Sequence, residues 1–194
     1  MQQSAAGAVD LTNSYRPDGL RHRRTDSSGT TQMIWDGDEP LAQVDTAGNL
    51  IQYWSRAGTD GAAWDGFELQ ERGWARLVKA RVPGSANPDQ YLHADWQGTV
   101  LASSGASGVG LVQNYPPRAW GQDSTTLAPF SWLGSHGYWY EGQLARTMHY
   151  VRARWYGEVD PHGWLSPDPL GFAGGDWNLY RYVRNRPTIK SLSQ

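Results

Sequence analysis

The sequence predicts an all-β fold of antiparallel strands, in one unit, with little helix. Aromatic residues make up 12% of the 194 residues, including 11 tryptophans and 10 tyrosines, and such side chains favour strands. Turn-forming residues are abundant as well, with 23 glycines and 11 prolines. Turn signals recur at intervals of about 8 to 11 residues, which is the spacing of successive hairpins. A chain of this length can bury a sizeable core.

Short apolar segments alternate with turns in the first part of the chain. Residues 1–14 are small and polar and are predicted to fray. In the predicted turns an Asp can cap its own turn and a Gly can supply a positive φ. The turns lie at 16–19, 26–29, 35–38 and 45–48. The strands predicted between and after them are 30–35, 41–44 and 50–54.

The middle of the chain is less regular. Residues 68–79 fit either a pair of strands or a short helix, and both alternatives stay open. Residues 82–89 contain two prolines and are predicted to be a loop. Two further strands are expected at 99–101 and 111–115, joined by a long Gly- and Ser-rich turn at 102–110.

The stretch from Ser166 to Pro169 must be irregular. Pro167 and Pro169 flank Asp168, and each proline removes a backbone donor and biases its neighbour toward extended or turn geometry. Neither a helix nor a central strand can therefore pass through this corner.

Glycines and aromatic residues follow this corner. Gly171, Gly174 and Gly175 permit a positive φ or a close backbone approach. Tyr180 and Tyr182 alternate with a polar residue, which predicts a short strand with its aromatic rings on one face. We expect four rings to dock this segment on a larger wall and to be largely buried. They are Trp164, Phe172, Tyr180 and Tyr182.

Composition argues against several functional classes. The formal net charge of −2 provides no overall basic field for nucleic acid or anionic lipid. The chain has no cysteine, and its 5 histidines lack ligand spacing, so we predict no metal and no cofactor. No apolar run is long enough to cross a bilayer, and the N-terminus does not resemble a secretory signal. The many Trp and Tyr rings leave carbohydrate binding as an alternative to packing between strands.

Three stretches resemble the Rhs (YD-repeat) family, in the order that the family has. Residues 15–54 resemble a degenerate array of tyrosine-aspartate repeats, and YLHADWQGTV at 91–100 is similar to a segment that precedes the family's core. Residues 152–187 contain RARWY, LSPDPLGFAGG and NLYRYVRNRP, and closely resemble the RHS repeat-associated core domain. The core-motif positions that we single out are Arg154, Trp155, Tyr156, Pro167, Pro169, Gly171, Gly174, Gly175, Asn178, Leu179, Tyr180, Tyr182, Asn185 and Pro187.

The resemblance implies an open, curled part of an Rhs-type β-shell with an irregular C-terminal plug. It implies that the chain helps to encapsulate and deliver a polymorphic toxin in interbacterial competition, and we expect no toxin within these residues. The implied partners are the remainder of the shell or a toxin domain encoded nearby, and the implied location is secreted or cell-surface as part of a larger protein. A free-standing carbohydrate-binding or adhesive protein is the alternative. The expected divisions are 1–14, the repeat sheet 15–150, the core segment 151–187 and a diverged tail 188–194.

The resemblance also implies a possible aspartyl autoprotease, because the family's core is thought to use two acids to cleave its own chain. Asp168 matches the second acid. At the position of the first acid this chain has Gly157, with Asp160 displaced along the sequence, and the family's cleavage motif is absent after Pro187. We therefore expect no enzyme activity, with Asp168 and Asp160 as vestiges of the catalytic pair and Asp168 acting as a turn-forming acid.

Overall fold

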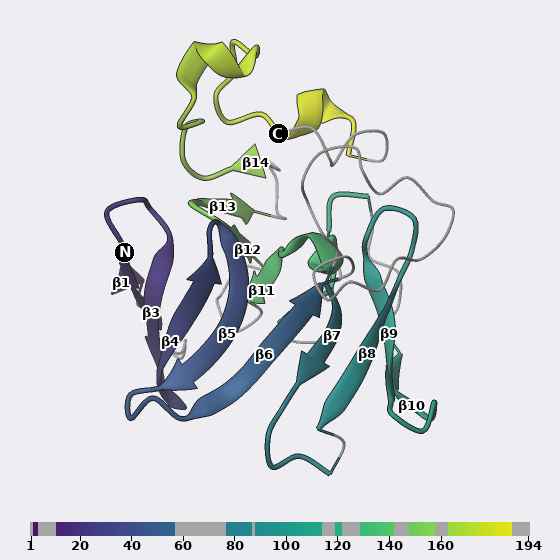
Figure 1. Cartoon of the computed structure of the whole chain (residues 1–194). Coiled ribbons are helices and arrows are strands. Elements are labelled where there is room, and N and C mark those ends of the chain that lie inside the picture. Colours follow the sequence, from purple (N-terminus) through teal and green to yellow (C-terminus); the bar gives the residue numbers. More distant parts are fainter. Residues whose placement is uncertain are drawn as a thin grey trace.

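The computed structural model describes the chain in eight stretches. They are residues 2–3, 11–56, 77–86, 88–113, 119–121, 129–141, 148–157 and 163–187. The described residues form two antiparallel sheets and an irregular C-terminal lobe, which we define as residues 163–187 (Figure 1). The all-β, open arrangement that the sequence predicts is therefore confirmed.

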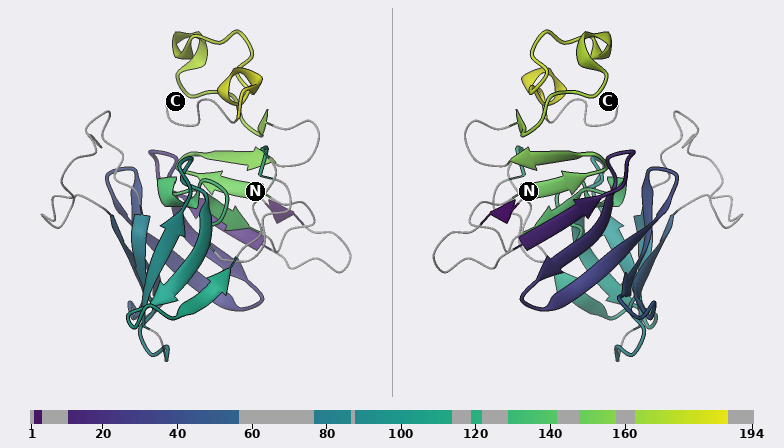
Figure 2. Two further views of the ribbon diagram at one scale, coloured as in Figure 1. Left: turned by 90° about the vertical axis from the view of Figure 1, so that its right-hand side faces the viewer. Right: turned by 90° about the vertical axis from the view of Figure 1, so that its left-hand side faces the viewer.

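The first sheet, sheet A, is a ten-stranded meander in which every strand pairs with its neighbour in sequence. Its strands are β1 (Gln2–Gln3), β2 (Leu11–Tyr15), β3 (Arg21–Asp26), β4 (Gly29–Asp36), β5 (Glu39–Asp45), β6 (Leu50–Arg56), β7 (Leu77–Arg81), β8 (Asp89–Ala94), β9 (Val100–Gly105) and β10 (Gly110–Gln113). The sheet curls around the second sheet rather than closing on itself (Figures 1 and 2).

Aspartates build the turns of sheet A in the way that the sequence predicts. The carboxylate of Asp26 accepts a hydrogen bond from the backbone N–H of Ser28, at 2.8 Å. Asp45 accepts from the N–H of Ala47 at 2.9 Å and from that of Asn49 at 2.8 Å. These side chains replace backbone partners that the tight turns cannot supply.

Several sequence predictions for sheet A need correction. The strands predicted at 30–35, 41–44, 50–54 and 99–101 are confirmed. The prediction that residues 1–14 fray is wrong where the structure describes them, because β1 (Gln2–Gln3) pairs with β2, which begins at Leu11. Residues 102–105, predicted as a turn, continue β9, because pairing with β8 and β10 on both sides outweighs the weak strand preference of small residues. Leu77–Arg81 is strand β7, whereas 68–76 lies outside the described residues.

The second sheet, sheet B, has four strands and covers one face of sheet A. Its strands are β11 (Trp139–Glu141), β12 (Met148–Val151), β13 (Arg154–Gly157) and β14 (Gly163–Trp164), paired in that order, and a 3-10 turn η1 (Gly134–His136) precedes them. All four residues of β12 are buried. This strand is therefore covered on both faces, which makes it the centre of the molecule.

Two aromatic clusters lie on opposite sides of sheet B. Between the sheets, the ring of Trp54 meets those of Phe130 at 5.2 Å and Trp139 at 5.5 Å, both edge to face. On the other side, under the lobe, Trp132 stacks on Tyr156 at 5.0 Å. The second cluster comprises Trp132, Leu133, Tyr138, Val151, Tyr156, Trp164, Tyr182 and Val183. Edge-to-face and offset contacts of this kind favour one defined packing.

The lobe projects from the body of the molecule (Figures 1 and 2). It contains two 3-10 turns, η2 (Gly171–Gly174) and η3 (Val183–Asn185). Gly171 and Gly175 have positive φ, a conformation that the sequence predicts glycine to permit at these positions. In η3 three consecutive residues without glycine have φ of 38°, 54° and 60°, a left-handed run that side chains disfavour.

The prediction for the four docking rings is half right. Trp164 and Tyr182 are buried, at 8% and 1% exposure, as predicted. The prediction is wrong for Phe172 and Tyr180, whose side chains are 65% and 52% exposed. The strand predicted at 180–182 is also wrong, because these residues form no strand. The turn that begins at Asn178 replaces the strand, so that Tyr180 points outward while Tyr182 points into the core.

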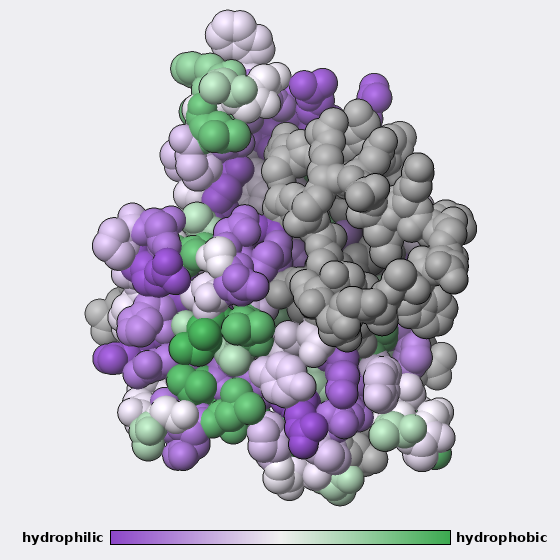
Figure 3. All heavy atoms as spheres, in the orientation of Figure 1, coloured by the Kyte–Doolittle hydropathy of each residue, from purple (hydrophilic) through white to green (hydrophobic). Residues whose placement is uncertain are grey.

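Apolar side chains are also exposed on sheet A. Ile34, Leu41 and Leu50 are each about two-fifths exposed. Figure 3 shows hydrophobic side chains gathered over the β4 to β6 region of the face in view. Among the described residues there is no helix with the length and apolar character that a bilayer span requires.

Candidate functional site at the lobe junction

An arginine from β13 holds the lobe against sheet B, and we call this contact the lobe junction. Arg154 Nη2 donates to the carbonyl oxygen of Ser166 at 2.8 Å and to that of Leu179 at 2.9 Å. Its guanidinium carbon lies 4.2 Å from the ring centroid of Trp164. The backbone N–H of Asp168 donates to the same Leu179 carbonyl, at 3.0 Å. One side chain thus fixes two separate stretches of the lobe.

Asp168 sits at the proline-flanked corner and shapes it. Its Oδ1 accepts from the N–H of Leu170 at 2.9 Å, and its carbonyl accepts from the N–H of Gly171, also at 2.9 Å. Its Oδ2 faces Arg154 Nη1 at 3.5 Å, a long ion pair. These contacts are what a turn-forming acid makes. Asp160, the other candidate acid, lies outside the described residues.

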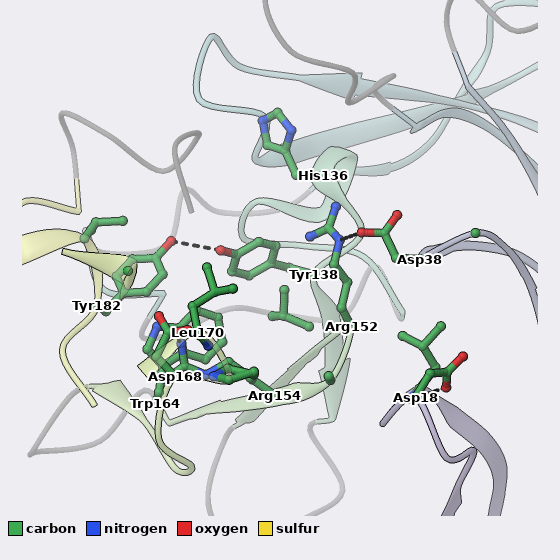
Figure 4. A pocket seen from close by; sticks show the side chains of 17 residues that line it. Asp18, Asp38, His136, Tyr138, Arg152, Arg154, Trp164, Asp168, Leu170 and Tyr182 are labelled. Carbon is green, nitrogen blue, oxygen red and sulfur yellow. Dashed lines mark hydrogen bonds and ion pairs between the residues drawn. The ribbon is translucent and has the colours of Figure 1, made fainter. Parts of the chain in front are cut away.

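A cavity of about 640 Å³ opens beside this corner, between the turns of sheet A, sheet B and the lobe. Its walls include apolar and aromatic side chains from all three parts, and charged side chains stand at its ends (Figure 4). The lining residues are Asp18, Leu20, Gly37, Asp38, His136, Tyr138, Val151, Arg152, Ala153, Arg154, Trp164, Asp168, Pro169, Leu170, Gly174, Tyr182 and Val183. Its volume falls in the range of ligand pockets.

Burial controls the ionisation of groups near the cavity. The hydroxyls of Tyr138 and Tyr182 lie 3.3 Å apart, and burial raises the pKa of both phenols, so they remain protonated at neutral pH. Desolvation lowers the pKa of Arg154, and the nearby Asp168 opposes that shift. Burial lowers the pKa of His149 on β12 to about 3, so this imidazole is neutral.

A second arginine joins the two sheets, and we call this contact the sheet junction. Arg21 Nη1 of β3 donates to Glu141 Oε1 of β11 at 2.7 Å, and both side chains are only 1% exposed. Arg24 Nη2 reaches Glu141 Oε2 at 3.1 Å. The backbone N–H of Arg21 donates to the hydroxyl of Tyr150 at 2.6 Å, and its guanidinium carbon lies 4.5 Å from the Tyr150 ring centroid.

The other core-motif residues have mainly structural contacts. Trp155 donates from Nε1 to the hydroxyl of Tyr15 at 2.8 Å, and Tyr156 donates to the carbonyl of Trp120 at 3.1 Å. Asn178 Oδ1 accepts from the N–H of Tyr180 at 3.0 Å. The structure therefore brings Arg154, Asp168 and Leu179 together in one contact, while Pro167 and Pro169 lie exposed at the corner.

Sequence reasoning missed the sheet junction. Arg21 lies in a polar, arginine-rich stretch that gives no sign of burial, and its partner Glu141 follows 120 residues later. No periodicity or spacing links residues that distant. The same holds for His149, which no pattern distinguished from a surface histidine.

Comparison with known proteins identifies relatives of one kind. No family model matches the chain. It is 31% identical over 195 residues to the probable deoxyribonuclease RhsB of Dickeya dadantii (strain 3937), covering 90% of this chain and 11% of that protein. It is also 31% identical over 192 residues to the probable deoxyribonuclease RhsA of the same strain, covering 88% of this chain and 11% of that protein. The chain thus spans about a tenth of the length of these relatives.

A similar fold occurs within larger solved structures. A crystal structure of TcdB2-TccC3-TEV matches 98% of this chain and 9% of that chain, with a TM-score of 0.61 and 16% identity. A Photorhabdus luminescens Tc holotoxin pore matches 97% of this chain and 9% of that chain, with a TM-score of 0.57 and 17% identity. At these identities the likeness concerns the fold. Together, the comparisons support the Rhs family for this chain, with the fold of an open, curled stretch of an Rhs-type β-shell.

Proposed function

We propose that this chain is a shell module of an Rhs-type protein that encapsulates and delivers a polymorphic toxin. In this proposal sheet A forms part of the shell wall, residues 151–187 are the RHS repeat-associated core segment, and no toxin is assigned to these 194 residues. Its partners are the remainder of the shell and a toxin domain. The larger assembly acts outside the producing cell, in competition between bacteria.

The observation that carries the proposal is the open meander with a docked second sheet. Within the described strands, β1 pairs only with β2 and β10 pairs only with β9, so each end of sheet A presents an edge. Unpaired edges are suited to receive further strands. The Dickeya relatives match this chain over most of its length and are about nine times longer. In a protein of that length, the rest of the polypeptide would supply the further strands.

The geometry at Asp168 favours a structural core segment over an autoprotease. Both Asp168 Oδ1 and its backbone carbonyl serve the turn, and among the described residues the charged group that faces Oδ2 is Arg154. An aspartyl protease needs two carboxylates that share a proton. In this proposal Asp168 is a turn-forming acid. The carbohydrate-binding alternative finds no support in the comparisons.

A chimera tests the proposal. The segment of Dickeya RhsB that matches this chain would be replaced by the chain itself, and the purified chimera would be treated with protease. Unmodified RhsB would be treated in parallel. If the chain is a shell module, the chimera should be cleaved no faster than unmodified RhsB, because the wall is complete. A chimera that is cut as readily as one carrying a Gly/Ser linker of equal length would contradict the proposal.

The chimera has a matched control within the chain. Glu141→Gln breaks the sheet junction without touching either edge of sheet A. A chimera with this change should lose protease resistance if the docked second sheet is part of the wall. Resistance equal to that of the unmodified chimera would mean that sheet B is dispensable to the shell.

A further inference from the structure

We infer that the cavity at the lobe junction binds a primary carboxamide carried on an apolar body, through Arg154 and Asp168. The inference goes beyond the proposed shell function. It rests on the pairing of these two side chains, on the apolar walls beside them and on the balance of charge around the cavity.

The Arg154–Asp168 pair presents a donor and an acceptor side by side. Arg154 Nη2 is already occupied by two backbone carbonyls, at 2.8 and 2.9 Å. Within the described part of the chain, the partner of Nη1 is Asp168 Oδ2, at the longer distance of 3.5 Å. A hydrogen bond at that distance is weak, so both atoms retain capacity for a closer partner.

A primary carboxamide fits this pair in both polarity and spacing. Its oxygen and nitrogen lie roughly 2.2 Å apart, as follows from the C=O and C–N bond lengths, and one N–H lies on the same side as the oxygen. The oxygen can accept from Arg154 Nη1–H while the N–H donates to Asp168 Oδ2, two parallel hydrogen bonds. A secondary amide in the trans form places its N–H on the opposite side and cannot make both.

Apolar walls continue from this pair along the cavity. Leu170, Val183, Val151 and Leu20 line it, together with the rings of Trp164 and Tyr138. Figure 4 shows Leu170 and Trp164 beside Asp168 and Arg154, with Tyr138 and Tyr182 farther along. A few placed polar groups within a mainly apolar lining are typical of a ligand site. The ligand's body is therefore a branched aliphatic or similar apolar group.

The charges around the cavity argue against an anionic ligand. Three carboxylates line it, and each is already paired with an arginine: Asp18 with Arg16 at 2.6 Å, Asp38 with Arg152 at 3.2 Å and Asp168 with Arg154 at 3.5 Å. Arg152 is also engaged by Glu39, at 2.6 Å. An additional negative charge would lie among acids without a free cation, whereas an uncharged amide carries no such penalty.

Glycine at position 174 leaves room beside the acceptor. A Cβ on Gly174 would stand 3.3 Å from Asp168 Oδ2. Gly174 has no positive φ that would require glycine, so the absence of a side chain matters here for space rather than for backbone conformation. An added methyl group would narrow the approach to Oδ2.

Binding of isocaproamide to the intact chain tests the inference. The indole N–H signal of Trp164, assigned with Trp164→Phe, would be followed in a nitrogen–proton correlation spectrum during titration. We expect this signal to shift saturably. Isocaproate and 5-methylhexan-2-one, which share the apolar body, should bind about tenfold more weakly, since each loses a hydrogen bond to a charged group. Equal binding of all three probes would overturn the carboxamide assignment.

Variants locate the site. Asp168→Asn keeps an oxygen for the Leu170 N–H and replaces the Oδ2 acceptor with a donor, so isocaproamide should bind about tenfold more weakly. Gly174→Ala should also weaken it. Asp45→Asn makes the same change on a turn of sheet A, away from the cavity lining, and is the matched control that should leave the affinity unchanged. Native affinity in Asp168→Asn, with its spectrum otherwise preserved, would overturn the inference.

The carboxamide could come from a free small molecule or from a glutamine side chain. A Leu-Gln-Leu peptide, acetylated and closed by an N-methylamide, carries its only primary carboxamide on the side chain. Tighter binding of this peptide than of isocaproamide would assign the site to a glutamine of a protein segment. Binding of isocaproamide alone would assign it to a small molecule. Saturable binding of neither probe would contradict the inference.

Discussion

The sheet junction and the lobe junction each combine an arginine, an acid and an aromatic ring, but they arrange these groups differently. At the sheet junction Arg21 lies against aromatic rings and is paired with Glu141 at 2.7 Å, with both side chains 1% exposed. At the lobe junction Arg154 lies against Trp164, but its close partners are backbone carbonyls, and its acid is 3.5 Å away. The first junction is a closed ion pair, whereas the second leaves a charged pair open to a ligand.

The largest expected effect comes from uncoupling the sheet junction. Glu141→Gln leaves Arg21 buried without its counter-charge, and we expect a loss of about 3 to 5 kcal/mol in the free energy of unfolding. Denaturant unfolding followed by tryptophan fluorescence measures this loss. The double variant Arg21→Met with Glu141→Leu should recover part of it, because the fully buried charge of Arg21 is removed while Arg24 keeps Asp26 as its partner. A double variant as unstable as the single one would mean that the arginine acts through packing instead.

The lobe's two tyrosines provide the next test. Tyr182→Ala should cost about 3 to 4 kcal/mol, since its ring is 1% exposed and packs on Tyr156 at 4.7 Å. Tyr180→Ala should change stability by no more than about 0.5 kcal/mol, because that ring is 52% exposed. Urea unfolding of each variant, compared with the unmodified chain, measures the two losses. Equal losses in both variants would show that the lobe's outer surface is covered.

Arg154→Lys examines the lobe junction itself. A lysine ammonium cannot reproduce the planar guanidinium that serves two carbonyls and stacks on Trp164, so we expect a loss of about 2 kcal/mol. Hydrogen exchange should show faster opening in residues 163–187 and unchanged protection in β3 to β6. Uniform loss of protection across the chain would mean that the lobe and the sheets open together.

The pH dependence of stability reports on β12, between the two junctions. Burial lowers the pKa of His149 from its usual 6.5 to about 3. Below about pH 6.5 the imidazole of the unfolded chain therefore binds a proton, while that of the folded chain stays neutral. The contribution of His149 to the free energy of unfolding is present in full only above this pH. We expect stability to fall by about 1.4 kcal/mol per pH unit as the pH drops from 6.5 toward 5.

His149→Phe is the control for this slope. Phenylalanine fits an apolar, aromatic setting among Trp132 and Tyr140, whose rings lie 5.3 and 5.6 Å from the imidazole, and it cannot titrate. The variant should flatten the dependence in this pH window. A slope that persists unchanged in His149→Phe would assign it to other groups.

Local chemistry made the sheets and turns predictable. The Asp-x-x-Gly turns carry their own signal, because the Asp side chain bonds to backbone only two to four residues ahead. The proline-flanked corner was predictable for the same reason. Tyr180 and Tyr182 show the limit of such patterns: alternation suggested a strand, but the Asn178 side chain caps a turn at this point.

The candidate site depends on distances that no local pattern contains. Arg154 meets carbonyls 12 and 25 residues later in the sequence, and carbonyl oxygens carry no signature in a side-chain pattern. Resemblance singled out Arg154 and Asp168 as motif positions, yet it gave neither their contact nor the cavity beside them. The pairing of Arg21 with Glu141 left no trace in the sequence at all.

The strictly sequential order of sheet A bears on how the chain acquires its structure. Each strand pairs with its immediate neighbours, so the sheet can grow strand by strand as the polypeptide emerges, and the connection from β6 to β7 is the longest that must be closed. The bond between Arg21 and Glu141 spans 120 residues and must form late. A hairpin could be added to or removed from the middle of the meander during evolution without changing the order of the other strands. The width of the sheet can therefore change by simple insertion or deletion.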